Sequence, residues 1–243
     1  MRALTYAKRT AREILRDPLN IAFGLGFPVI LLLLLSAIQK NVPVQLFEIE
    51  SLAPGIAVFG LSFITLFTAT LIAKDRESAL LERLCTTPMK SVDFIIGYTL
   101  SVIPIALTEG AVCYIVALVL GLTPNVNVIY AALMIAPISL FYISLGLLFG
   151  SILNVKQVGG VCGALLTNLS AWLSGVWFDT ELLGENFQKI TRLLPFLHAV
   201  ELERALISGN FAAFPSHLYP VLIYTLIFAI GATVLFLRGI RKK

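Results

Sequence analysis

Long apolar stretches alternate with short polar segments along this chain. Six such stretches stand out, at about residues 21–39, 52–73, 94–120, 128–153, 158–178 and 218–237. A helix needs about 20 apolar residues to cross the hydrocarbon core of a bilayer, and each stretch is close to or above that length. Because lipid offers the backbone no hydrogen-bond partners, such stretches form helices. The pattern predicts an all-α, polytopic membrane protein with six transmembrane helices.

Composition supports this interpretation and excludes several classes of protein. Of the 243 residues, 58% are hydrophobic and 13% are charged, whereas soluble proteins carry about 25% charged residues. A soluble fold of this size could not bury so much apolar surface. We therefore exclude an ordinary soluble enzyme, a disordered chain and a disulfide scaffold. The three cysteines lie far apart without a CxxC pattern, so we expect free thiols.

The positive charges predict the orientation of the chain in the membrane. Of its 18 Lys and Arg residues, 14 fall in the N-terminal segment, residues 74–93, residues 154–157 and the C-terminal tail. Six spans place these four regions on one side, and Lys and Arg accumulate on the cytoplasmic side. We expect a multi-pass protein of the plasma (inner) membrane with both termini in the cytoplasm. The net charge of +4 reflects this topology, and no nucleic-acid partner is expected.

Residues 1–20 precede the spans and form a separate N-terminal segment, and residues 21–243 form the transmembrane domain. At 100° per residue one face carries the apolar residues Leu4, Ala7, Ala11, Ile14 and Leu15, and the adjoining flank is basic. This pattern predicts an amphipathic helix in the cytoplasmic interface. Such a helix is either a simple positive-inside anchor or an element that docks on another part of the protein.

A long external segment, residues 179–217, precedes the last span. It contains apolar patches at 193–197 and 200–207, which predict short helices packed on or dipping into the outer leaflet. Its two histidines are His198 and His217, and Glu201 follows His198 at helical spacing. Two candidate ligands are weak support for a metal site, so we interpret this spacing as a surface helix.

Within the spans, one charged residue and two packing patterns stand out. Glu109 lies well inside the third span, where a carboxylate is costly and is usually paired or functional. It is either a hydrogen-bond anchor between helices or a proton or cation site. The sequence Gly146-x-x-x-Gly150 permits close helix approach. Phe59, Phe63 and Phe67 recur every four residues on the second span, which is typical of packing and less often of an apolar substrate path.

The link between the second and third spans carries the most informative motif. Residues 74–90 predict a short charged helix with Leu80, Leu81 and Leu84 clustered on it, ended by Thr86-Thr87-Pro88. Apolar side chains ringed by charge suit a groove on a cytoplasmic partner, although a simple connecting loop is the plainer alternative. No GxxxxGK[ST], GxSxG or HExxH pattern occurs in the sequence.

Residues 75–89, D-R-E-S-A-L-L-E-R-L-C-T-T-P-M, resemble a known family signature. They are similar to the K-R-E-x-G-x-L-E-R-L-x-T-T-P pattern of type-2 ATP-binding-cassette (ABC-2) exporter permeases, of the drug-resistance and polysaccharide-export kind. Ser78-Ala79 departs from that pattern. The resemblance extends over nearly the whole chain, because the basic N-terminal helix, the spans and the apolar external segment occur in the same order.

The resemblance implies a complex of two permease subunits, identical or different, with two copies of a separately encoded ABC ATPase. ATP and Mg²⁺ are then bound by that partner, and no cofactor is expected on this chain. Residues 1–20 become a connecting helix and residues 76–88 a coupling helix, with a smaller contact at 154–157. The residues implied to contact the ATPase are Glu77, Leu81, Glu82 and Arg83. Those implied to flank the translocation path, on spans two and five, are Phe63, Phe67, Asn168 and Trp172.

We therefore hypothesise a transport subunit rather than an enzyme. It would export an amphipathic drug-like, lipid-like or glycan substrate by alternating access, in contact with membrane lipids. One alternative is an ion-coupled secondary transporter that uses Glu109. A second is a membrane-embedded enzyme acting on lipids, which would need clustered His, Asp or Glu residues at one interface.

Overall fold

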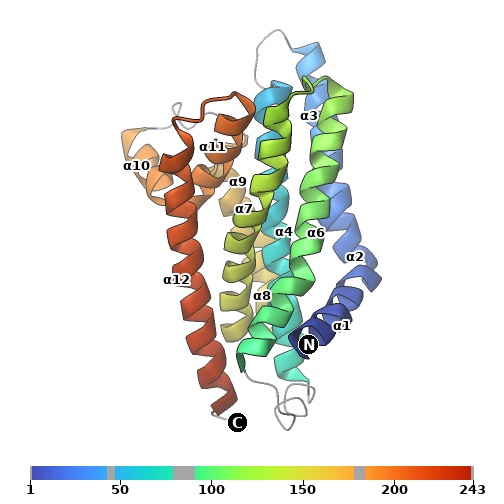
Figure 1. The fold of residues 1–243 in the computed structure, drawn as a ribbon, viewed down its shortest axis with the longest axis vertical. Coiled ribbons are helices and arrows are strands. Elements are labelled where there is room, and N and C mark those ends of the chain that lie inside the picture. The colour runs from blue at the N-terminus through green and yellow to red at the C-terminus, as the bar shows by residue number, and fades with distance from the viewer. Residues whose placement is uncertain (1, 43–46, 79–90, 178–183, 242–243) are drawn as a thin grey trace.

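The computed structural model describes residues 2–42, 47–78, 91–177 and 184–241. Every regular element within these ranges is a helix, and no strand occurs in them. The long helices stand side by side along the long axis of the molecule (Figure 1). The predicted all-α fold class is thus confirmed.

Five helices in the described ranges are long and apolar enough to cross a membrane. The first, Ala22–Asn41, consists of η1 (Ala22–Gly26) continued by α3 (Phe27–Asn41). The others are α4 (Ile49–Glu77), Val92–Leu120 within α6 (Ser91–Leu120), α7 (Val126–Ile152) and Phe214–Arg238 within α12 (Phe214–Arg241). They coincide with five of the six predicted spans and give a multi-pass membrane protein.

The stretch expected at 158–178 takes a different form. Here α8 (Val155–Val158), η2 (Gly159–Leu166) and α9 (Thr167–Leu173) follow one another without a break. The central eight residues have the wider turns of a π-helix, and three of them are glycine, which weakens the regular α-helix. Thus the fifth predicted span is not one long α-helix but a helical run of residues 155–173 with a π-helical centre.

The helix α4 lies at the centre of the bundle. It is buried along nearly its whole length and packs against α3, α6, α7 and η2. The contact with α7 is close, as the glycine spacing predicted: a Cβ on Gly146 would lie 2.7 Å from the Thr65 carbonyl oxygen, and one on Gly150 would lie 2.8 Å from that of Ala69. By contrast, α12 exposes Leu222, Leu226 and Ile230, among other apolar side chains.

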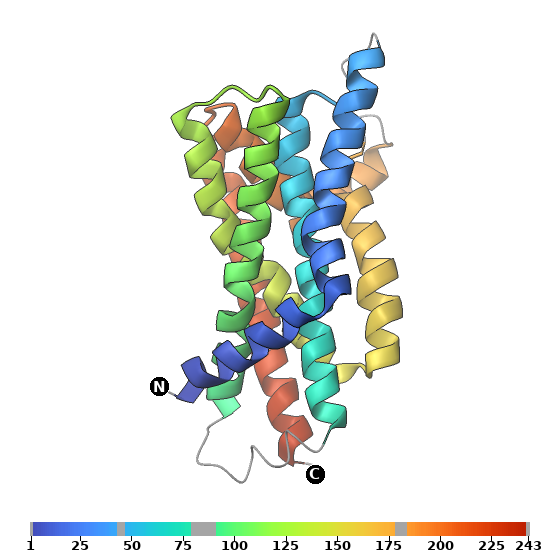
Figure 2. The same cartoon turned by 90° about the vertical axis from the view of Figure 1, so that its right-hand side faces the viewer.

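The helix α1 (Arg2–Arg16) lies obliquely across one end of the long helices, the end at which α12 also finishes (Figure 2). A short helix, α2 (Pro18–Ile21), joins it to η1. The apolar face predicted for α1 is divided into a part that is buried and a part that is exposed. Ala7 and Ile14 are buried together with Tyr6 and Thr10, whereas Leu4 is 67% exposed. The reason is that α1 packs on α6, so its protein-facing side is rotated away from the apolar stripe.

The opposite end carries two short helices, α10 (Glu185–Leu193) and α11 (Pro195–Ile207). They confirm the prediction of short helices before the last span. The helix α11 is almost entirely buried, and it packs against α4, α7 and α12 rather than lying on the surface. Of the cysteines, Cys113 and Cys162 are free and buried, and Cys85 lies outside the described residues.

Candidate functional site

Three consecutive charged residues, Asp75, Arg76 and Glu77, form the last turn of α4. They lie at the same end of the molecule as α1 (Figure 1), shortly before residues 79–90. A helix leaves its last carbonyl groups without partners inside the helix, and its terminal side chains are free to reach neighbouring elements. Each of the three side chains contacts a different part of the structure, and we call them the α4 terminal triplet.

Asp75 joins α4 to α1 and α6. Its side chain is only 4% exposed, and its Oδ2 atom accepts hydrogen bonds from the hydroxyls of Tyr6 and Tyr98, each at 2.7 Å. The Tyr6 ring packs edge-on against the Tyr98 ring, with centroids 5.3 Å apart. Burial, and then the charge of Asp75, raise the pKa of Tyr6, so that the phenol remains a hydrogen-bond donor. A Cβ on Gly97 would collide with the Tyr6 ring, so this position must be glycine for α1 to approach.

Arg76 holds the end of α7. Its Nη1 atom donates to the carbonyl oxygens of Gly150, at 2.8 Å, and of Leu153, at 3.3 Å. Both carbonyls belong to the last turn of α7 or follow directly after it, where intrahelical donors are lacking. A guanidinium at this position also opposes the partial negative charge of the helix C-terminus.

Glu77 holds the start of α8. Its Oε1 atom accepts a hydrogen bond of 2.9 Å from the backbone N–H of Val155. A capping box also stabilises the N-terminus of this short helix: the side chains of Asn154 and Gln157 each accept a hydrogen bond from the backbone N–H of the other. The α4 terminal triplet therefore fixes α1, α6, α7 and α8 against one helix end.

Among the residues expected to contact an ATPase, the structure describes only Glu77. Its side chain is exposed while its Oε1 atom caps α8. Leu81, Glu82 and Arg83 lie outside the described residues. Asp75 and Arg76 were not among the expected site residues, because their partners lie 23 to 77 residues away in sequence.

The residues expected to flank a translocation path fall into two groups. Phe63 and Phe67 on α4 are buried, and the Phe63 ring packs against Phe27 at 5.5 Å and Phe59 at 5.9 Å between centroids. Asn168 is exposed on α9, with its amide donating to the Ala164 carbonyl of the preceding η2. Trp172 is 54% exposed on the same helix. The single chain therefore does not bring the four side chains into one cluster.

Glu109 is enclosed between three helices. Its side chain is 1% exposed, and neither carboxyl oxygen has a hydrogen-bond partner among the described residues. On α4 a Cβ added to Gly60 would overlap the carboxyl group, and that same Cβ would touch Pro28 of α3. An isolated charge is costly in such a site, so the packing suits the neutral acid.

The opposite end contains a polar cluster on α11 that the sequence analysis missed. Glu203 is fully buried and accepts a hydrogen bond from the Tyr114 hydroxyl of α6. Burial raises the pKa of Glu203 to about 8, and the Tyr114 hydrogen bond opposes that rise. Arg204 donates to the carbonyl oxygens of Ser51, at 3.3 Å, and Gly175, at 3.0 Å. The available signal was that Glu203 occupies a position on the apolar stripe of α11, at helical spacing from Phe196 and Val200.

Comparison with known proteins assigns this arrangement to a family. Residues 2–208 match the family model described as ABC-2 type transporter, which covers α1 through α11, including the α4 terminal triplet. The chain is also similar to Nodulation protein J of Rhizobium meliloti (strain 1021), with 26% identity over 196 residues, 81% of this chain and 73% of that protein. These matches confirm the predicted transport subunit, and ABC-2 permeases pair with ABC ATPase subunits. The chain belongs to the ABC-2 type transporter family and is the membrane subunit of such a transporter.

Proposed function

We propose that the chain is the permease subunit of an ATP-driven exporter, in which two permease subunits assemble with two ABC ATPase subunits. The helical run of residues 155–173 serves as a further membrane crossing, which gives six in all. Six crossings are supported by the position of α1 and the end of α12 at one end of the molecule (Figure 1). That end carries Lys8, Arg12, Arg76 and Lys156, so it lies on the cytoplasmic side of the plasma (inner) membrane.

The α4 terminal triplet is the observation that carries this proposal. Residues 76–88 form the coupling segment and bind the ATPase through Glu77, Leu81, Glu82 and Arg83. A displacement of this segment reaches the end of α4, and from there passes to α1, α6, α7 and α8 through the hydrogen bonds of Asp75, Arg76 and Glu77. In this scheme α1 is the connecting helix, and the hydrogen bond from Tyr6 to Asp75 holds it to the end of α4, directly before the coupling segment.

The helix α4 carries the displacement to the other end of the molecule. Its 29 residues span about 43 Å. At its far end Arg204 of α11 binds the Ser51 carbonyl, so α11 moves with α4 when the exporter opens. This arrangement supports rigid-body alternating access in which α11 acts as part of the external gate.

The translocation path lies along the face of α4 that carries Phe63 and Phe67. That face lies beside η1, where a Cβ on Gly24 would come within 2.8 Å of the Phe67 ring. A second permease subunit completes the path from the side of Asn168 and Trp172, which the single chain leaves exposed. The wall is aromatic and uncharged, which favours an amphipathic drug-like, lipid-like or glycan substrate over a strongly charged one.

Glu109 has a structural role in this scheme. A coupling-ion site needs access to water and partner ligands, whereas the carboxyl of Glu109 is enclosed by α3, α4 and α6. The family match supports an ATPase-driven transporter over the ion-coupled one, and over an enzyme acting on lipids.

A charge reversal in the coupling segment tests the proposal. The variant Glu82→Lys with Arg83→Glu should insert into the membrane normally, but should no longer co-purify with the ATPase or support export. The matched control reverses Glu185 and Lys189 on α10, at the far end of the molecule, and should keep both properties. Full export by the first variant, or transport by purified permease in vesicles without any ATPase, would contradict the proposal.

A further inference from the structure

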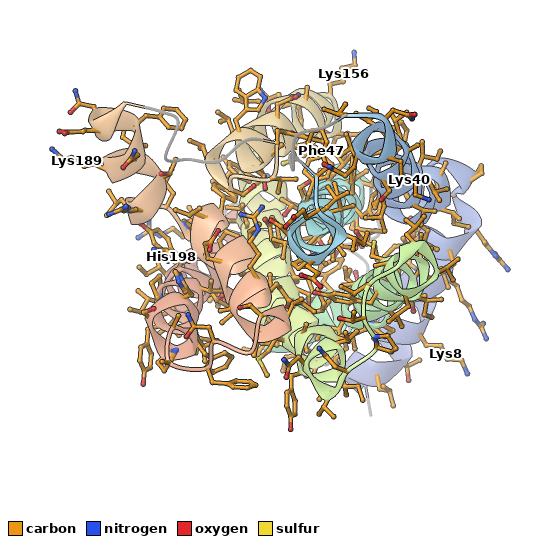
Figure 3. All side chains as sticks on the ribbon, turned by 90° about the horizontal axis from the view of Figure 1, so that it is seen from above. Lys8, Lys40, Phe47, Lys156, Lys189 and His198 are labelled. Carbon is orange, nitrogen blue, oxygen red and sulfur yellow. The ribbon has the colours of Figure 1, made fainter. Side chains whose placement is uncertain are left out.

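Two histidines from different helices meet at the end of the molecule that carries α10 and α11. The Nδ1 atoms of His198 on α11 and His217 on α12 are 3.1 Å apart. Their rings are tilted by 44°, with centroids 5.3 Å apart. Both side chains are half-buried, so water and dissolved ions reach them. Figure 3 looks down on this end and shows His198 on the same side of the molecule as Lys189 of α10.

The hydrogen bonds of His198 determine which of its nitrogens is free to bind. Its Nε2 atom lies 2.9 Å from the Arg192 carbonyl oxygen, which can only accept, so Nε2 carries the hydrogen. In the neutral ring the Nδ1 lone pair then points at His217. Metal-binding histidines are commonly held in this way, with the second ring N–H donating to a backbone carbonyl.

We propose that His198 and His217 form a binding site for a divalent transition-metal ion of the Zn²⁺ type. Two imidazole nitrogens on one tetrahedral Zn²⁺ lie about 3.3 Å apart, since each Zn–N bond is about 2.0–2.1 Å. The observed separation of 3.1 Å is close to this value, and the two rings must turn so that both Nδ1 lone pairs point at the ion rather than along the line between the nitrogens. Imidazole nitrogen selects Zn²⁺, Cu²⁺ and Ni²⁺ over Mg²⁺ and Ca²⁺, which prefer oxygen.

Without metal, the contact is a hydrogen bond in which His217 Nδ1–H donates to His198 Nδ1. On binding, His217 changes tautomer: the hydrogen leaves Nδ1, an equivalent one is taken from solvent at Nε2, and both Nδ1 lone pairs face the ion. The described residues contain no cluster of three or more His, Cys, Asp or Glu side chains suited to a metal. The site therefore supplies two protein ligands, and water completes the coordination.

A metal ion at this site would fasten three helices together. The carbonyl of Arg192 belongs to α10, His198 to α11 and His217 to α12. The Tyr224 hydroxyl of α12 already donates to the Leu193 carbonyl at the end of α10, so the ion adds to an existing contact. One further expectation rests on the proposed function. Zn²⁺ should slow export, because α11 is then held to α12 and cannot move with α4.

Thermal unfolding of the purified full chain in detergent, prepared without a polyhistidine tag, tests the site. At pH 7.5, ZnCl₂ at about 100 times its dissociation constant should raise the unfolding temperature by about 5 °C, and EDTA should reverse the shift. Isothermal titration should give one Zn²⁺ per chain, and MgCl₂ should have no effect. His198→Gln and His217→Gln should each abolish the shift, whereas the control Glu185→Gln on α10 should retain it.

Several outcomes would overturn the inference: no shift in the wild-type chain, an equal shift with MgCl₂, or a Zn²⁺ shift that survives either histidine substitution. If a variant unfolds too readily to compare, Zn²⁺ titrations of the wild-type chain at pH 7.5 and 5.5 replace it, and equal affinity at both would count against imidazole ligands. These measurements do not depend on transport. Zn²⁺ binding without any effect on export therefore contradicts only the proposed motion of α11.

Discussion

Removing one hydroxyl from the Asp75 cluster should loosen α1 specifically. In Tyr6→Phe the ring stays, with its edge-on contacts to Phe94 and Tyr98, but Asp75 loses one of its two donors. A hydrogen bond to a charged group contributes about 1.5–3 kcal/mol. The Asp75 side chain is 4% exposed, so water does not replace the donor without opening the contact. A loss of about 2 kcal/mol corresponds to about 30-fold more frequent detachment of α1.

Hydrogen exchange measured by mass spectrometry reports this detachment directly. Peptides from α1 should exchange about 30-fold faster in Tyr6→Phe, and peptides from the buried part of α7 should not change. The control is Tyr219→Phe at the opposite end, where the side chain is 63% exposed. In the double variant Tyr6→Phe with Tyr98→Phe the carboxylate keeps neither donor, so its effect should exceed the sum of the single changes. Unchanged α1 exchange in Tyr6→Phe, or strict additivity in the double variant, would refute the role assigned to Asp75.

Three further predictions concern other parts of the bundle. Gly60→Ala should destabilise the chain by about 1–3 kcal/mol, because its Cβ overlaps the Glu109 carboxyl, and Glu109→Ala in the same chain should recover most of the loss in thermal unfolding. Gly150→Val should prevent stable packing of α7 on α4, since its Cβ would lie 2.8 Å from the Ala69 carbonyl oxygen, and size-exclusion chromatography should show aggregation where Ile152→Val does not. Because the pKa of Glu203 is raised from 4.5 to about 8, its contribution to stability is complete below pH 4.5 and is lost as the pH rises through about 8. The unfolding temperature should therefore fall over this interval in the wild-type chain and fall less in Glu203→Gln; equal slopes would contradict the burial of this group.

The long apolar stretches predicted the long helices well. Bilayer thickness sets the length of such a helix, and hydropathy can be calculated from neighbouring residues alone. The stretch at 128–153 became Val126–Ile152, a difference of two residues at most. The stretch at 52–73 became Ile49–Glu77, since the helix continues through charged residues that hydropathy treats as its end. The fifth stretch differed, because the cost of glycine in a regular helix depends on neighbours that composition does not describe.

The contacts of the candidate site were harder to predict from the sequence than the helices were. The motif at 75–89 identified the family, but it did not show that Asp75, Arg76 and Glu77 each bind a different element. Those contacts join residues far apart in the chain, and a single sequence holds no record of such pairs. For α1, helical periodicity gave the helix but misplaced its buried side. Tyr6 and Thr10 were left out of the predicted apolar face, yet both are buried, with their hydroxyls bonded to Asp75 and to the Tyr6 carbonyl.

The wide turns of η2 have a consequence for the surface that follows them. A π turn contains about one residue more than an α turn, and one residue corresponds to a rotation of about 100° about the helix axis. If a single wide turn in residues 159–166 tightened, α9 would rotate by that angle while α8 stayed capped by Glu77. Asn168 and Trp172 would then present a different side of the helix to whatever lies beside them. Such a rotation would also withdraw Ser170 from the Tyr142 hydroxyl, so η2 and the α9 packing against α4 and α7 would have to change together.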